Sequence, residues 1–198
     1  MPRKYELRRR AERREETRRR IVEATVILHE TFGAGRTTIS DIAARAGVER
    51  ATVYRHFPDE QTLLTACIGH YLAQYPPPDP GSWGEIGDPV TRLRTALLEI
   101  YAYHRRTERM ADRTERDLPD LPTLQAVLAP GLAHWARLRD ALTTGWPVPE
   151  ERRALVVAGI GHAIAFLTWR SLVREQGLDD DQAVAAMVAM VRGLAGDG

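Results

Sequence analysis

The stretch TTISDIAARAGVERATVYRHFPDEQTLL, residues 37–64, decides how the rest of the chain is organised. It has the pattern of a helix, a tight turn, a second helix and the start of a third. Thr38 precedes the first apolar residue and suits a helix N-cap, with Asp41 three positions later completing a capping box. Gly47 stands where a left-handed residue ends a helix, and Pro58 stops the second helix. The spacing therefore predicts two short helices that meet at a turn.

The two predicted helices each have an apolar inner face, and the second has an unusual outer face. In the first helix, one face carries four apolar residues at i, i+3, i+4 and i+7: Ile39, Ile42, Ala43 and Ala46. In the second, residues 50–56, Val53 and the following Phe57 point inward together. The outer face holds cations, hydroxyls and a methyl group, with no carboxylate after Glu49. Such a surface fits a helix-turn-helix motif, whose second helix offers short and basic side chains to the DNA major groove.

This stretch resembles the DNA-binding motif of the TetR family of transcriptional regulators. The matching positions are Thr38, Ile42, Ala43, Ala46, Gly47, Val48, Thr52, Tyr54, His56, Phe57, Pro58, Leu63 and Leu64. Two positions depart from the family, since Glu49 stands where Ser or Thr is usual and Glu60 where Lys is usual. The family's Lys contacts a DNA phosphate. A carboxylate would repel one, so that contact is not expected for Glu60.

The predicted DNA-contacting residues lie on or beside the second helix of the motif: Thr38, Arg50, Ala51, Thr52, Tyr54, Arg55 and His56. The two arginines supply guanidinium forks for base edges, and Ala51 with Thr52 can meet a thymine methyl. Tyr54, His56 and Thr38 are expected to bond phosphates, which position the protein without reading sequence.

Composition describes an ordinary globular chain with an uneven charge. Of 198 residues, 43% are hydrophobic and 28% charged, and the net charge is +1. Residues 1–66 carry 14 Lys/Arg against 10 Asp/Glu, whereas residues 67–198 carry 14 against 17. A basic front suits a chain that holds nucleic acid at one end. The single cysteine excludes an intrachain disulfide, and the apolar run at residues 154–169 is shorter than the roughly 20 residues of a membrane span. We therefore expect a cytosolic protein without a membrane partner.

The N-terminal residues 3–20 hold ten Lys/Arg and four Glu. They are either a solvated helix extension or a basic arm that neutralises phosphates or enters the minor groove, and the pattern leaves both open. The first regular helix is expected to start near Arg14 and to end before Gly33. Its apolar stripe is expected to comprise Ile21, Ala24, Leu28 and Phe32.

The remaining pattern is helical throughout, with one proline- and glycine-rich break at residues 75–87, in which Trp83 is expected to be a buried anchor. Further helices are predicted over residues 60–75, 88–117, 124–142, 149–176 and 180–194. The expected fold is all-α. A three-helix helix-turn-helix domain with a basic arm is placed at residues 1–66, and a helical effector-binding and dimerisation bundle at residues 67–198.

Catalytic and metal chemistry find little support in the residue pattern. His104, His134 and His162 lie on three different predicted helices without the short ligand spacing of a metal site. No Gly-x-Ser-x-Gly elbow or phosphate-binding loop is present in the sequence. We expect no enzyme activity, no metal and no cofactor.

The predicted bundle contains a set of aromatic and polar residues on the inward sides of its helices: Tyr101, His104, Met110, Arg113, Trp135, His162, Phe166 and Trp169. They either fill the core or line an apolar pocket with a few polar groups that holds a small organic ligand. The resemblance to TetR regulators implies the second, because in that family this region is the effector pocket.

The two C-terminal helices are expected to form a homodimer interface, because they hold more small and apolar residues than one buried stripe needs. The proposed interface residues are Ala158, Gly161, Ala165, Met187 and Met190. The resulting hypothesis is a homodimeric, ligand-responsive DNA-binding regulator on a palindromic operator, with repression implied by the resemblance alone. Two alternatives stay open: a helical enzyme or carrier with an incidental helix-turn-helix, and an architectural DNA-binding protein without an effector.

Overall fold

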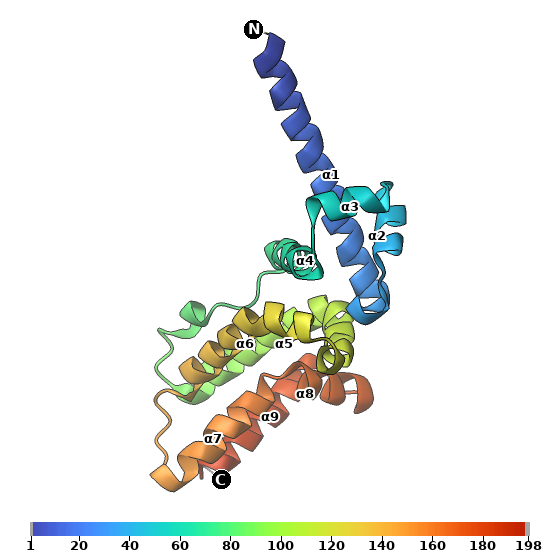
Figure 1. Ribbon diagram of the computed structural model, residues 1–198. Coiled ribbons are helices and arrows are strands. Elements are labelled where there is room, and N and C mark those ends of the chain that lie inside the picture. The colour runs from blue at the N-terminus through green and yellow to red at the C-terminus, as the bar shows by residue number, and fades with distance from the viewer. Residues whose placement is uncertain (1, 197–198) are drawn as a thin grey trace. The chain divides into compact units, whose positions relative to one another are not determined.

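The computed structural model describes residues 2–196, apart from the side chains of residues 2–4 and 7 (Figure 1). This range contains helices and loops and no strand, which confirms the predicted all-α class. Its α-helices are α1 (Pro2–Phe32), α2 (Ile39–Ala46), α3 (Arg50–His56), α4 (Glu60–Gln74), α5 (Pro89–Asp117), α6 (Pro122–Thr143), α7 (Glu150–Ala163), α8 (Phe166–Arg170) and α9 (Asp180–Ala195). Shorter turns are η1 (Ala34–Arg36), η2 (Pro80–Trp83), η3 (Leu118–Asp120) and the π-helical η4 (Ser171–Glu175).

The backbone divides into two compact units whose segments alternate along the chain. Unit 1 comprises the chain up to Pro76 together with Arg109–Leu128, and unit 2 comprises Pro77–Glu108 and the chain from Ala129 onward. This differs from the predicted division at residues 66 and 67, because the end of α5 and the start of α6 pack with the N-terminal helices. The single helix α5 therefore begins in unit 2 and ends in unit 1.

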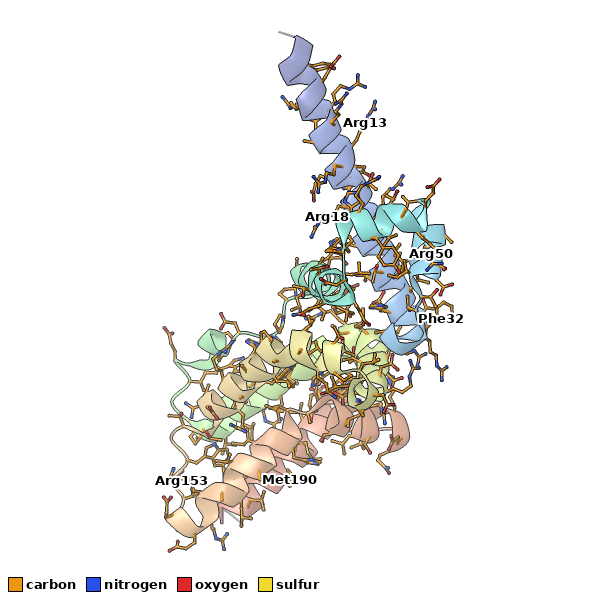
Figure 2. The ribbon with its side chains drawn as sticks, in the orientation of Figure 1. Arg13, Arg18, Phe32, Arg50, Arg153 and Met190 are labelled. Carbon is orange, nitrogen blue, oxygen red and sulfur yellow. The ribbon has the colours of Figure 1, made fainter. Side chains whose placement is uncertain are left out.

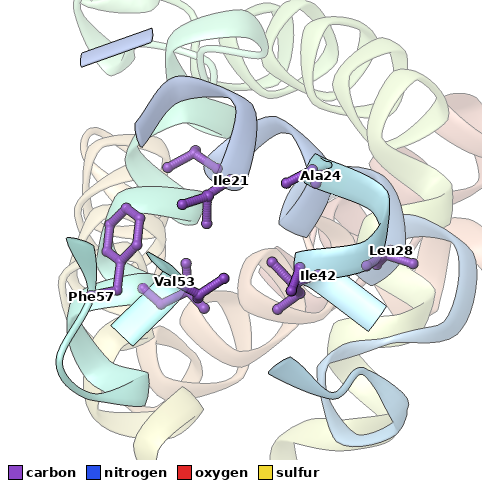
Figure 3. Packing of buried hydrophobic residues seen from close by; sticks show 10 residues of the cluster. Ile21, Ala24, Leu28, Ile42, Val53 and Phe57 are labelled. Carbon is purple, nitrogen blue, oxygen red and sulfur yellow. The ribbon is translucent and has the colours of Figure 1, made fainter. Parts of the chain in front are cut away.

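The core of unit 1 lies between α1, α2, α3 and the start of α4 (Figure 3). Its buried residues include Ile21, Ala24, Leu28, Ile42, Ala43, Ala46, Val53, Phe57 and Leu63. Each large apolar side chain buried in this way contributes about 1.5–3 kcal/mol relative to its exposed state. The helical spacing predicted for residues 39–46 and the inward pair Val53 and Phe57 are confirmed.

Helix α1 ends before Gly33 as predicted, but its start and the extent of its apolar stripe differ from the prediction. It begins at Pro2 rather than near Arg14, so the charged N-terminal residues form a continuous helix. Because ion pairs such as Arg8–Glu12 and Arg19–Glu16 stabilise an exposed helix, no apolar stripe is needed there. At the other end Phe32 is 51% exposed, since the buried stripe stops at Leu28, one turn earlier.

The end of α5 holds the turn that follows α1. The backbone N–H of Gly35 donates to Asp117 Oδ2 at 3.0 Å, and the Arg116 guanidinium donates to the carbonyl of Phe32 at 2.7 Å. Arg113 also donates to the carbonyl of Thr31, at 3.4 Å. Carbonyls in the last turn of a helix lack intrahelical partners, and these two arginines supply them. Residues far along the chain thereby fix the entry into the helix-turn-helix.

Unit 2 is built around the N-terminal two-thirds of α5. This stretch buries Leu93, Ala96, Leu97, Ile100 and Tyr101 completely, while α7 and α9 pack against each other. Within the proline-rich break, Trp83 is buried and donates to Glu99 Oε2 at 2.8 Å, which confirms its predicted role as an anchor. The four tryptophans of the chain all belong to this unit: Trp83, Trp135, Trp146 and Trp169.

The single helix predicted over residues 149–176 is wrong, because the chain breaks between α7 and α8. Ala165 has extended φ and ψ angles of −71° and 140°, although no proline or glycine stands there. Two side chains of α5 donate hydrogen bonds to the backbone carbonyls at the break. Tyr101 donates to the carbonyl of Ala163, and the His104 Nε2–H donates to that of Ile164, each at 3.0 Å. These bonds from another helix stabilise a break that local sequence does not predict.

Within residues 2–196 no single helix is both long and apolar enough to cross a membrane. Helix α7 and the α8–η4 segment meet that criterion only as a pair bent by 62°, on length and composition alone. Four of their large side chains are buried in unit 2: Val156, Ile160, Phe166 and Trp169. The pair therefore has the burial of core helices.

Candidate nucleic-acid interface

Helix α2 begins and ends with the two capping devices that its sequence predicts. The Asp41 N–H donates to Thr38 Oγ1 at 3.2 Å, and the Thr38 N–H donates to Asp41 Oδ2 at 2.9 Å. The Thr38 hydroxyl also donates to Asp41 Oδ2, at 2.6 Å. The bonds to the carboxylate, first that from the hydroxyl and then that from the Thr38 N–H, lower the pKa of Asp41 and so keep its carboxylate charged. At the other end Gly47 is left-handed, with φ of 65° and ψ of 43°. The turn sets the angle at which α3 leaves α2.

Helix α3 turns the predicted DNA-contacting side chains outward. Val53 has no exposed surface and Phe57 almost none, so they hold the helix on the core. The other side chains on or beside α3 are exposed or half-buried, as the prediction requires: Thr38, Arg50, Ala51, Thr52, Tyr54, Arg55 and His56. Arg55 donates to Thr52 Oγ1 at 3.3 Å, so these two side chains lie together. Figure 2 shows Arg50 on the outer side of unit 1.

Positive charge gathers at the C-terminal end of α3. Partial burial lowers the pKa of His56, and the nearby cations Arg14, Arg55 and Arg18 lower it further. The Arg18 guanidinium also lies over the ring of Phe57, 5.0 Å from its centroid. Glu60, in the first turn of α4, is exposed, where a carboxylate would repel a phosphate. This end of the motif can attract phosphates through α1 and α3, whereas the start of α4 cannot.

Comparison with known proteins matches both the motif and the whole fold. The family described as "Bacterial regulatory proteins, tetR family" matches residues 21–67. The probable HTH-type transcriptional regulator ArpR of Pseudomonas putida is 29% identical over 195 residues, covering 96% of this chain and 83% of ArpR. The HTH-type transcriptional regulator TtgR of the same species is 28% identical over 193 residues, covering 95% of this chain and 82% of TtgR.

The chain belongs to the TetR family.

Solved structures share its fold. NalD, described as the secondary repressor of the MexAB-OprM multidrug efflux pump in Pseudomonas aeruginosa, has a TM-score of 0.64 at 23% identity, covering 94% of this chain and 100% of NalD. A TetR-like regulator from Rhodococcus sp. RHA1 has the same TM-score at 18% identity, covering 91% and 96%. With these relatives, the chain is a DNA-binding transcriptional regulator and not an enzyme.

In unit 2 of this TetR-family regulator, five of the eight predicted effector-pocket residues form one cluster, in which four rings surround His104. Its imidazole stacks on Trp135 with ring centroids 5.4 Å apart and meets Phe166 edge-on at 5.6 Å. Trp169 lies 6.1 Å away and Tyr101 6.3 Å away. The sequence interpretation missed a sixth ring, Tyr103, which lies 6.0 Å from Trp135. Tyr103 could have been found from its position between Tyr101 and His104 on α5.

The other three predicted pocket residues lie elsewhere. Met110 packs in unit 1 against the buried cluster of Val26, Cys67 and Tyr71. Arg113, also in unit 1, donates to Thr31 and pairs with Asp112. His162 is exposed on α7 and lies 3.3 Å from the hydroxyl of Thr168. The prediction placed them correctly on helices but on the wrong faces or in the wrong unit.

The polar atoms of the aromatic cluster are partly paired within the protein. Tyr101 donates to the Ala163 carbonyl, and Trp169 Nε1 donates to Asp180 Oδ1 at 3.0 Å. Both residues have no exposed surface, so they support the core. With Nε2 of His104 donating to Ile164, the neutral ring presents Nδ1 as an acceptor. Trp135 is half-buried and offers the most accessible ring face.

Two of the histidines of unit 2 bond separate backbone carbonyls. His134 Nε2 lies 2.9 Å from the carbonyl of Pro78, and His104 serves that of Ile164. Over the described range, no three His, Cys, Asp or Glu side chains are arranged to hold a metal ion.

The predicted dimer residues fall on two different faces of α7 and α9. Met187 is 9% exposed and so is buried within one protomer, while Met190 Cε would lie 3.9 Å from a Cβ added at Gly159 of α7. Within the protomer, α7 and α9 approach closely at Gly159, where an added Cβ would come 2.5 Å from Leu194 Cδ1. Of the predicted set, Ala158 is exposed, while Gly161, Ala165 and Met190 are half-buried. The buried residues of α7, which are Val156, Gly159, Ile160 and Ala163, are not among the predicted interface residues.

Two buried histidines should make stability depend on pH. Burial lowers the pKa of His29 from 6.5 to about 4, against an opposing effect of Asp117. Burial also lowers the pKa of His104 to about 4, against its bond to Ile164. Because both values are lower in the folded chain, the unfolded chain takes up protons first. The stability is therefore fully present above about pH 6.5 and is lost as pH falls through about 4.

The variant His104→Gln isolates one of these contributions, since Gln can still donate to Ile164 and cannot become charged. Urea unfolding at several pH values should show wild-type stability falling between pH 6.5 and 4, by on the order of 2–3 kcal/mol for this residue. The variant should fall less over the same range. Carboxylates titrate equally in both proteins and cancel in the comparison. Parallel curves would contradict the prediction.

Proposed function

We propose that this regulator is a homodimeric repressor that binds a palindromic operator in the cytosol and is released by a small organic effector bound in unit 2. The observation that supports DNA reading is the outer face of α3, where arginines, a hydroxyl and a methyl are exposed on a helix held by Val53 and Phe57. A helix of this composition in the major groove accounts for the whole motif.

The side chains of this face divide into base readers and phosphate binders. Arg50 and Arg55 would contact guanine edges through their guanidinium forks, and Ala51 with Thr52 would contact a thymine methyl. The remaining members of the set, which carry a hydroxyl or an imidazole, would bond phosphates and fix the register. The Arg55–Thr52 hydrogen bond supports a shared contact with one base step.

Replacing a base-contacting residue should reduce discrimination among DNA sequences, whereas replacing a phosphate-contacting residue should reduce affinity for all of them. Arg50→Ala is expected to cost about 1–3 kcal/mol of discrimination among operator sequences, because a bidentate base contact is lost. Tyr54→Phe should weaken binding to all duplexes about equally, since only a phosphate contact is removed. Mobility-shift titrations against the operator and point-mutated versions of it measure both. If Arg50→Ala weakened every duplex alike, Arg50 would be a phosphate contact.

The effector proposed for unit 2 is apolar and aromatic, with one hydrogen-bond donor. The rings around His104 favour stacking with a flat ligand, and Nδ1 of the neutral imidazole would accept a hydrogen bond from the ligand's donor. A ligand bound here would also act on the break between α7 and α8, which His104 and Tyr101 hold. The ligand shifts the equilibrium between the conformation that binds DNA and the one that does not only by the difference in its affinity for these two conformations.

The same mobility-shift assay separates this proposal from its alternatives. A carrier with an incidental helix-turn-helix would show no salt-dependent binding to duplex DNA. An architectural protein would bind DNA and would remain bound in the presence of every compound of an aromatic library. Release by one class of aromatic compound supports the proposal.

The homodimer is supported by the faces that α7 and α9 leave exposed. On α7 these are Leu155, 52% exposed, and Ala158. On α9 the exposed residues include Ala185 and Ala189. Two small, apolar faces on neighbouring helices can meet their copies around a two-fold axis, as a four-helix bundle.

A further inference from the structure

The N-terminal half of α1 is a helix that extends beyond the core of unit 1. The residues buried on α1 begin at Ile21, whereas those from Glu12 to Glu16 are exposed. Figure 1 shows this half of α1 standing clear of α2, α3 and α4, and Figure 2 shows Arg13 on it. An exposed helix of this length gains almost no stability from tertiary packing, because it buries almost no apolar surface.

The charges on this extension are sorted between two faces. One face carries the glutamates and the arginines that pair with them: Arg8 Nε lies 2.8 Å from Glu12, and Arg19 Nη2 lies 2.6 Å from Glu16. Arg19 also approaches Glu23 at 3.8 Å. Glu12 and Glu16 line an open groove beside α4, together with Ala66 and His70, and Arg18 reaches the same groove. On this face acidic and basic side chains neutralise each other.

The other face carries arginines one helical turn apart. Arg10, Arg14 and Arg18 follow each other at intervals of four residues, about 5–6 Å along the axis. In the described part of the chain no ion pair engages Arg10 or Arg14, while Arg18 has a distant carboxylate, Glu15, at 4.0 Å. This row is therefore a line of largely uncompensated positive charge.

The row continues onto the end of the recognition helix α3. Arg18 lies over Phe57, the residue that follows α3. After the effect of its burial, Arg14 and Arg18 join Arg55 in lowering the pKa of His56, and the single carboxylate of Glu15 opposes them. The basic surface of α3 and the arginine row of α1 thus meet at one place in unit 1. The arginine row of α1 would therefore lead away from an anion that is bound beside His56.

We propose that Arg10, Arg14 and Arg18 of α1 form a second DNA-contact surface, which binds backbone phosphates flanking the base pairs that α3 reads. This inference rests on the proposed function of α3. Duplex DNA is the partner whose chemistry fits, because it presents a line of phosphates that continues past the recognised bases. The paired arginines Arg8 and Arg19 stabilise the helix and make no such contact.

A matched pair of double variants tests this in the full chain. Arg10→Gln with Arg14→Gln removes two charges from the proposed surface, and Arg8→Gln with Arg19→Gln removes two from the paired face. The probe is a duplex selected from a random library with the wild-type chain, and the same duplex lengthened by about ten base pairs, one helical turn, at each end. Binding is measured by mobility shift over a series of salt concentrations, with helix content checked by circular dichroism.

On the long duplex, the Arg10/Arg14 variant should reduce the slope of log affinity against log salt by up to about 1.8, or about 0.9 for each lost phosphate contact. The Arg8/Arg19 variant should keep the wild-type slope, and the two variants should differ less on the short duplex. Equal reductions in both variants would show a general charge effect and overturn the inference. So would an unchanged slope in the Arg10/Arg14 variant.

The outcome also separates this inference from the proposed function. If the wild-type chain bound no duplex, or if Arg50→Ala had no effect on any duplex, the function proposed for α3 would fail. If Arg50→Ala weakened binding while the Arg10/Arg14 variant did not, only the second surface would be overturned. Binding of the row to anionic lipid vesicles instead of the flanking DNA would overturn it as well.

Discussion

Gly33→Ala should destabilise unit 1 by about 2–3 kcal/mol and weaken DNA binding with it. Gly33 has φ of 91° and ψ of 164°, a region that is essentially restricted to glycine. An added Cβ would also collide with the Arg116 guanidinium and the Asp117 carboxylate. Both side chains hold the turn before α2, so they cannot move aside without losing those bonds. The substitution therefore strains the backbone and opens the contact.

Gly35→Ala is the matched control for this prediction, because it lies two residues away on the same turn. Its φ is not positive, and its added Cβ would meet Asp117 Cγ at 3.4 Å, an ordinary contact. Urea unfolding followed by circular dichroism should show a large loss for Gly33→Ala and a small change for Gly35→Ala. Equal losses in the two variants would contradict the argument from φ.

Ala158→Glu should convert the regulator to monomers and weaken binding to a two-half-site operator by roughly a hundredfold or more, the order of the gain from linked sites. Ala158 is exposed on α7, so a carboxylate there is solvated in the monomer and buried only in the proposed dimer. Gly161 is a poorer choice, since a Cβ there lies 3.5 Å from Arg139 of its own protomer. Sedimentation velocity measures the association state.

Gln176→Glu makes the same charge change at an exposed position after η4 and serves as the control. It should sediment and bind as wild type does. If Ala158→Glu remained dimeric and bound the operator normally, the interface would lie elsewhere. If it became monomeric but kept full affinity, a single half-site would be sufficient.

The helix-turn-helix could be predicted from sequence because its determinants are local. Thr38 and Asp41 cap a helix three residues apart, and Gly47 ends it with its own backbone conformation. Val53 and Phe57 face inward because of their spacing alone. The exposed set on α3 follows from these inward residues by exclusion.

The features that could not be predicted depend on distant residues. The break before α8 is held by Tyr101 and His104, which lie some sixty positions earlier. Asp117 joins unit 1 by binding Gly35, at a separation of 82 residues, so no linear boundary describes the units. The buried face of α7, which includes Val156 and Ile160, could not be singled out because small and apolar residues occupy more than one of its faces.

The placement of all four indoles in unit 2 makes the two units optically distinct. Unit 1 contains tyrosines such as Tyr54 and Tyr71 and no tryptophan, so fluorescence excited at the red edge of absorption arises from unit 2 alone. Circular dichroism follows the helices of both. Thermal melts recorded by the two methods would coincide if the units unfold together. If unit 1 melts first, the two curves separate, and their separation measures how strongly helix α5 ties one unit to the other.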